Sequence, residues 1–73
     1  MNEKRYFRDH DDDSLIVRVW IDEKGNRRGE YWGFKSKKWH EADDLAWMVA
    51  DEIYDNHPMS EEMVEEIIGG KPE

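Results

Sequence analysis

The chain has 73 residues, a formal net charge of −8 and no cysteine. This length predicts one domain over 1–73, with flexible tails at 1–3 and 71–73, and the absence of thiols excludes disulfides and thiolate metal sites. A domain of this size buries only about 60% of the surface of its unfolded chain. We therefore expect four Trp, three Tyr and two Phe to supply much of its core.

The N-terminal half of the chain predicts strands. Apolar side chains alternate over 14–21 and many are β-branched, which indicates a strand. A turn containing Gly25 and Asn26 leads into a second predicted strand over 29–35. Residues 4–8, which precede an acidic turn, are predicted as a third strand, with an extended arm as the alternative.

The C-terminal half predicts two helices. Apolar residues recur at spacings of three and four, which predicts a long helix over 41–56. Pro58 ends this helix, and Ser60 is a suitable N-cap for a short helix over 61–68. The predicted stripe of the long helix, whose centre is Val49, would pack on the alternating strand face.

The predicted fold class is therefore α+β. An antiparallel β-meander of two or three strands carries the long helix on one face, and the short C-terminal helix closes one end. The second sheet face would then remain uncovered, which makes it a candidate interface. The side chains expected there are Ile16, Trp20, and Trp32 or Phe34.

Charge is sorted along the chain. Residues 24–38 hold six bases against one acid, whereas residues 41–73 hold eleven acids against one base. Such asymmetry concerns partners and association rather than fold. No apolar run approaches the roughly 20 residues that span a bilayer, so we expect a cytoplasmic protein with no membrane partner.

The acidic half gives the leading functional hypothesis. A row of carboxylates on rigid helices resembles a nucleic-acid backbone to a protein with a Lys/Arg-lined groove, and tryptophans anchor interfaces well. We predict a non-enzymatic interaction module that binds such a cationic groove, without a cofactor or a metal. The expected partner-binding residues are Asp44, Asp51, Asp55, Glu61, Glu62, Glu65, Glu66, Trp20, Trp32 and Trp47.

In being very short, free of cysteine, acidic and rich in aromatic residues, the chain is similar to small phage-encoded anti-defence proteins, such as those of the anti-CRISPR type. This resemblance is one of composition. It implies an inhibitor that acts in the host cytoplasm by occupying a nucleic-acid-binding groove.

Two alternatives use other surfaces. Single-stranded nucleic-acid binders combine cations with aromatic side chains, and the hairpin region 24–38 has both. Its candidate nucleic-acid-binding residues are Lys24, Arg27, Arg28, Lys35, Lys37 and Lys38. The other alternative is a homodimeric assembly module that pairs the uncovered sheet faces of two copies.

Catalytic and metal-binding sites have weaker support in the sequence than these interaction surfaces. His40 and Asp44 are four residues apart at the start of the predicted long helix, but an acid–base pair also needs a pocket and a third, orienting group. The acidic run 9–13 begins like a calcium loop, yet Ser14 stands where the loop needs Gly and Trp20 stands where it needs Glu. No enzyme activity is predicted.

Overall fold

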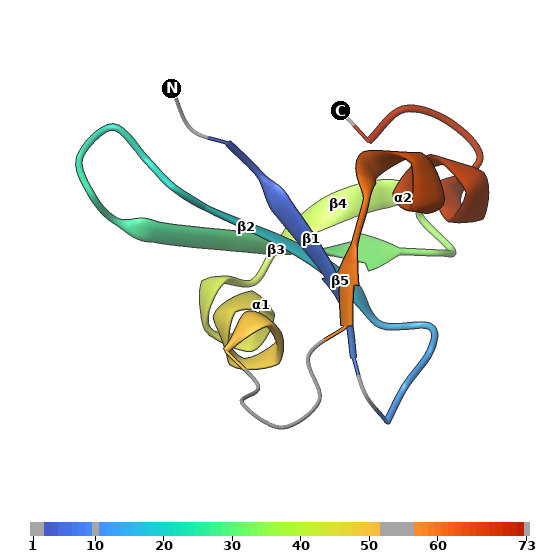
Figure 1. The fold of residues 1–73 in the computed structure, drawn as a ribbon, viewed down its shortest axis with the longest axis horizontal. Coiled ribbons are helices and arrows are strands. Elements are labelled where there is room, and N and C mark those ends of the chain that lie inside the picture. The colour runs from blue at the N-terminus through green and yellow to red at the C-terminus, as the bar shows by residue number, and fades with distance from the viewer. Residues whose placement is uncertain (1–2, 10, 52–56, 73) are drawn as a thin grey trace.

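A computed structural model describes residues 3–9, 11–51 and 57–72, which form one antiparallel sheet with a helix on each face (Figure 1). The strand order is β4-β3-β2-β1-β5. The elements are β1 (Arg5–Arg8), β2 (Ile16–Ile21), β3 (Arg27–Gly33), β4 (Lys38–Glu41), α1 (Asp43–Ala50), β5 (His57–Met59) and α2 (Glu61–Ile68). The α+β class is confirmed, as is a strand within 4–8.

The prediction of two or three strands is wrong, because two edge strands were missed. The β4 strand has no alternating apolar pattern and owes its conformation to pairing with β3, where Trp32 lies opposite Trp39. The β5 strand contains Pro58, which argued against a strand. An edge strand tolerates proline because one side of it needs no ladder hydrogen bond, and β5 pairs only with β1 in the described sheet.

Helix α1 is shorter at its start than predicted. Glu41 belongs to β4, and the helix begins at Asp43 after Ala42, whose backbone N–H donates to the Gly29 carbonyl at 2.9 Å. The last part of the predicted helix, residues 52–56, lies outside the described part of the chain. His57, the residue before Pro58, lies on β5 opposite Arg8.

The main core lies between α1 and one face of β1, β2 and β3. Its buried members on α1 are Ala46, Val49 and Ala50, which pack with Val17 and Val19 of β2. Small residues on the helix allow it to approach the sheet closely. The alternating face of β2 is thus buried as predicted, except at its end, where Ile21 is 43% exposed.

The opposite sheet face is covered, so the expectation of an uncovered apolar face is wrong. Ile16 of β2 and Val64 of α2 are both fully buried in a second cluster, against which Trp32 and Trp39 pack. Arg18, on the same face, is only 4% exposed. Phe34 is not on this face, because it lies in the turn between β3 and β4.

Arg18 also holds the end of the chain against the sheet. Its Nη1 donates to the Pro72 carbonyl at 2.7 Å, and its Nε donates to Glu30 Oε1 at 2.7 Å. The guanidinium lies 4.3 Å from the centre of the Trp39 ring, within cation–π range. Pro72 is buried by this arrangement, although residues 71–73 were expected as a tail.

Candidate interaction surfaces

Four glutamates cover the solvent side of α2. Glu61, Glu62 and Glu66 are exposed, and Glu65 is half-buried. Residues four apart share one side of a helix, so these acids form two adjacent like-charged pairs. Within residues 3–9, 11–51 and 57–72, none of the four carboxylates takes part in an ion pair. Helix α2 therefore presents uncompensated negative charge.

The local sequence fixes where α2 begins and ends. The Ser60 hydroxyl oxygen accepts a hydrogen bond from the Met63 backbone N–H at 3.2 Å, which confirms the predicted N-cap. Met59 and Val64 lie buried in one cluster, as a hydrophobic staple requires. Gly69 leaves the helix with φ of 83°, a conformation that favours glycine.

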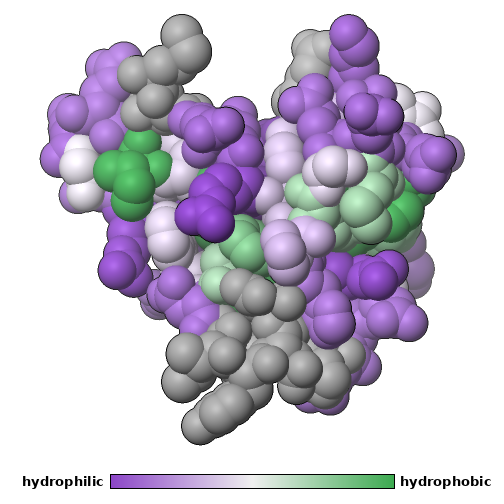
Figure 2. All heavy atoms as spheres, viewed as in Figure 1, coloured by the Kyte–Doolittle hydropathy of each residue, from purple (hydrophilic) through white to green (hydrophobic). Residues whose placement is uncertain are grey.

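An apolar pair lies beside the acids of α2. Met63 is 44% exposed and Ile67 is 40% exposed, and the two are one turn apart. Figure 2 shows apolar surface over this part of the molecule. Glu62 and Glu66 precede them by one residue each, and a helix has about 3.6 residues per turn, so the acidic strip lies a little over a quarter of a turn around α2 from the apolar pair. This combination suits a partner surface that is both cationic and apolar.

The predicted acids of α1 do not join those of α2, because the two helices lie on opposite faces of the sheet (Figure 1). Asp44 is exposed on α1. Asp51 pairs with Arg27 at 3.4 Å, so part of its charge is compensated within the fold. Asp55 lies outside the described residues. The structure therefore does not bring the predicted carboxylates into one row.

The three predicted tryptophan anchors are half-buried and also lie apart. Trp47 is on α1, where its Nε1 donates to the Arg28 carbonyl at 2.9 Å. Trp32 packs against the cluster on the sheet face that α2 covers, and Trp20 points to the same face because it alternates along β2 with Ile16. Trp20 lies beneath the Lys4 ammonium, 4.9 Å from the ring centre, while Trp32 packs edge-on against Trp39. Each of these rings serves internal packing.

The basic residues of 24–38 form separate groups. Arg27 pairs with Asp51, and Arg28 pairs with Glu41 at 2.8 Å. Lys24 lies in the turn between β2 and β3, whereas the remaining lysines lie at the other end of β3. At the usual strand rise, the seven residues of β3 separate Lys24 from them by roughly 20 Å. Those lysines, in or next to the turn between β3 and β4, are Lys35, Lys37 and Lys38.

The turn between β3 and β4 also holds a polar pair that the sequence analysis missed. The Ser36 Oγ and His40 Nε2 atoms share a hydrogen bond of 2.6 Å. His40 lies on β4 and stacks on Tyr31, so its pairing with Asp44 on a common helix, considered from the sequence, is wrong. The sequence shows only that Ser36 and His40 are four residues apart, and this spacing is equally typical of two residues on one side of a helix.

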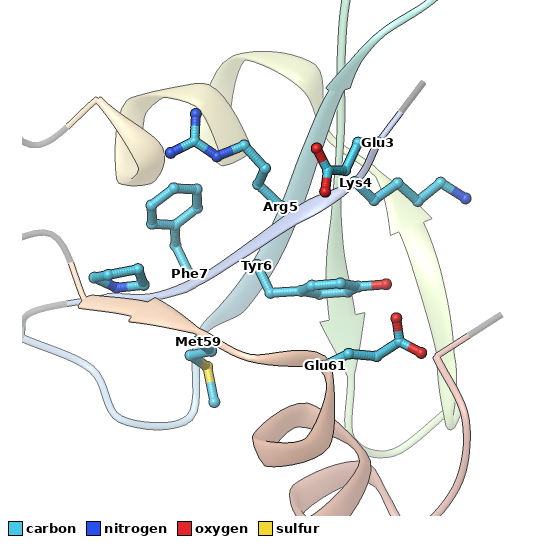
Figure 3. Close-up of a pocket in the computed structure, with 8 residues that line it drawn as sticks. Glu3, Lys4, Arg5, Tyr6, Phe7, Met59 and Glu61 are labelled. Atoms are coloured by element: carbon cyan, nitrogen blue, oxygen red, sulfur yellow. The ribbon is translucent and has the colours of Figure 1, made fainter. Parts of the chain in front are cut away.

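A groove lies at the junction of β1 and β5 (Figure 3). Its lining residues are Glu3, Lys4, Arg5, Tyr6, Phe7, Pro58, Met59 and Glu61. Figure 3 shows that Arg5 and Phe7 leave β1 on one side, whereas Lys4 and Tyr6 leave it on the other, with Glu61 beside Tyr6. The charged groups of the groove are therefore divided between the two sides of β1.

The acidic turn before β2 is satisfied by its own backbone. Asp9 Oδ2 accepts hydrogen bonds from the N–H groups of Asp11 and Asp12, both at 3.0 Å. The hydroxyl and N–H of Ser14 donate to Asp12 Oδ1, and these bonds lower the pKa of Asp12. Among the residues that the structure describes, no three His, Asp or Glu side chains are grouped as a metal site would need.

Comparison with known proteins yields no relative: no family model, no curated protein and no solved structure matches the chain. Neither of the helices in the described ranges has the length and apolar character that crossing a membrane requires. The functional argument therefore depends on the surfaces of this molecule alone.

Proposed function

We propose that the chain is a non-enzymatic interaction protein that docks helix α2 into a cationic, nucleic-acid-binding groove of a partner protein. It would thereby act as an inhibitor that competes with nucleic acid, as anti-defence proteins of phages do. The interface is narrower than the sequence suggested, because α1 and its acids lie on the far side of the sheet.

The observation that carries this proposal is the placement of charge on α2. Like charges four apart destabilise a helix by about 0.2–0.5 kcal/mol per pair. Glu65 and Glu66 also lie near the helix C-terminus, where negative charge is unfavourable, and the last turn holds no base. Glu61 and Glu62 lie in the first turn, where negative charge suits the helix dipole. Glu65 and Glu66 do not serve the stability of α2 in this way, so a role in binding explains these two better.

The apolar pair gives the proposal its second component. Complementary charge speeds association and selects partners, but exposed ion pairs alone add little affinity. Met63 and Ile67 supply apolar area beside the acids, and apolar anchors are typical of the centres of interfaces. We therefore expect the partner groove to have an apolar floor and a rim of Lys and Arg.

The test begins with capture of partners from nuclease-treated host lysate, at low and at high salt. A captured protein is purified, and displacement of labelled nucleic acid from it is measured with increasing amounts of the chain. The proposal requires that the partner binds nucleic acid and that the chain competes for the same site. Capture of a protein that keeps its nucleic acid when the chain binds would refute it.

Matched triple variants separate α2 from general acidity. Changing Glu62, Glu65 and Glu66 together to Gln should weaken binding about tenfold, which is about 1.4 kcal/mol, and flatten the dependence of affinity on salt. The control changes three exposed acids on other elements by the same total charge: D13N, E23Q and D44N. Equal losses in both triples would mean that net charge, rather than α2, determines binding.

A further inference from the structure

Ser36, in the turn between β3 and β4, lies next to His40 of β4, so a potential nucleophile is beside a base. Neither residue is on α2. Ser36 is exposed in this turn and His40 is half-buried on β4. Their Oγ and Nε2 atoms are 2.6 Å apart. The Ser36 hydroxyl has two acceptors within reach, the Gly33 carbonyl at 3.4 Å and, much closer, His40 Nε2. In the tautomer that carries its proton on Nδ1, Nε2 accepts the hydroxyl proton of Ser36. This is the contact by which a histidine activates a serine.

Three neighbours hold this pair in place. The His40 ring stacks on Tyr31 with a centroid distance of 5.1 Å and an interplanar angle of 22°. The Lys37 N–H donates to the Gly33 carbonyl at 2.7 Å and closes the turn. A Cβ at Gly33 would lie 2.5 Å from Ser36 Oγ and 2.6 Å from His40 Nε2. The pair therefore depends on the absence of a side chain at Gly33.

The pair opens into a hollow with apolar walls. Leu15, Trp32 and Phe34 supply apolar and aromatic surface, and Lys35 adds a positive charge near the serine. Phe34 is 43% exposed. An acyl chain could lie against these walls with its carbonyl at the mouth.

We propose that Ser36 is a covalent acyl-acceptor site, activated by His40, for donors of the activated ester or thioester class. Ser36 Oγ attacks the donor carbonyl carbon while its proton passes to His40 Nε2. The bond from carbon to the leaving oxygen or sulfur then breaks, and the leaving group takes the proton back from the imidazolium. The products are a serine ester and a free alcohol or thiol, with no oxidation or reduction.

The test uses p-nitrophenyl acetate as the donor, with the whole chain, followed by digestion and mass spectrometry. Acetyl groups on lysines next to Ser36 are amides, which hydroxylamine leaves intact, whereas it removes a serine ester. Ser60 is an internal reference, because its hydroxyl is exposed and caps α2 without a histidine. The expected result is a hydroxylamine-labile acetyl group at Ser36 that forms at least tenfold faster than one at Ser60.

Variants assign the effect to the pair. H40Q keeps a polar side chain but removes the base, so acetylation of Ser36 should fall to the rate of Ser60. The control H57Q removes an imidazole from β5 and should leave the rate unchanged. G33A should also lower the rate, and circular dichroism checks that each variant is folded. Labelling at the Ser60 rate in the unmodified chain, or labelling of Ser36 that survives H40Q, would overturn the proposal.

Discussion

Replacement of Gly29 by Ala should loosen the contact between β3 and α1. Gly29 is buried on β3, and a Cβ there would lie 2.5 Å from the Cβ of Ala46 and 3.4 Å from the Asp43 carbonyl oxygen. Carbon atoms in contact are about 3.5–4.0 Å apart, so helix and strand would have to separate by about 1 Å. Two hydrogen bonds resist this movement, from Gly29 N–H to Asp43 Oδ1 and from Ala42 N–H to the Gly29 carbonyl.

The expected loss of stability follows from two opposing effects. Overpacking of a core costs about 1–3 kcal/mol, whereas Gly to Ala recovers about 0.4–1 kcal/mol by restricting the unfolded chain. The net loss should be about 1–2 kcal/mol, which lowers the Tm of a domain of this size by about 4–16 °C. Urea and thermal unfolding followed by Trp fluorescence and circular dichroism would measure it.

Two further variants test the reasoning. Gly70→Ala is the control, because a Cβ there meets nothing within 4 Å, and it should leave stability nearly unchanged. Ala46→Gly should cost about 1 kcal/mol alone through helix propensity, but combined with Gly29→Ala it removes the colliding methyl group. The pair should show a favourable coupling of about 1 kcal/mol. Strictly additive losses, or a neutral Gly29→Ala, would refute the proposed contact.

Three other changes have definite expected outcomes. Arg18→Met should lower the free energy of unfolding in urea by about 2–4 kcal/mol, because it leaves Glu30 and the Pro72 carbonyl without their shared partner; a loss below about 1 kcal/mol would contradict this. Ser60→Ala should cost about 1 kcal/mol by removing the N-cap of α2, measured in the same way. Hydrogen bonds from the backbone N–H groups of Asn26 and Lys24 lower the pKa of Asp22, so its stabilising contribution is present above the unfolded pKa and is lost as pH falls through the folded one. Asp22→Asn should therefore reduce the fall of the urea midpoint below about pH 4, and an unchanged acid profile would exclude this effect.

Local signals in the sequence were sufficient where an element depends on its own residues. The limits of α2 follow from Ser60, the apolar spacing and Gly69, and the structure has them where the sequence put them. The strand predicted over 14–21 was likewise evident from its period of two, although in the structure it begins at Ile16. The edge strands β4 and β5 were not evident, because their conformation comes from partners distant in sequence and β5 contains Pro58.

The candidate site was harder to predict because it depends on which face of the sheet each helix covers. Periodicity predicted an apolar stripe on the long helix but carried no information on where the short helix would pack. The structure has Val64 of α2 against Ile16 and Ala46 of α1 against the opposite face. Acids such as Asp44 and Glu62, which the sequence grouped together, are therefore separated by the sheet.

Counting charges along the chain also overstated the surface available to a partner, because three ion pairs among the described residues use some of these charges within the fold. The three ion pairs join Arg18 to Glu30, Arg27 to Asp51, and Arg28 to Glu41. Each pair joins neighbouring strands or the sheet to α1, so these acids and bases contribute to the architecture. Once they are set aside, the largest group of adjacent, unpaired carboxylates on one described element is that of α2. For this reason the proposed docking role depends on α2 alone, and it predicts that binding responds to changes on that helix rather than to net charge.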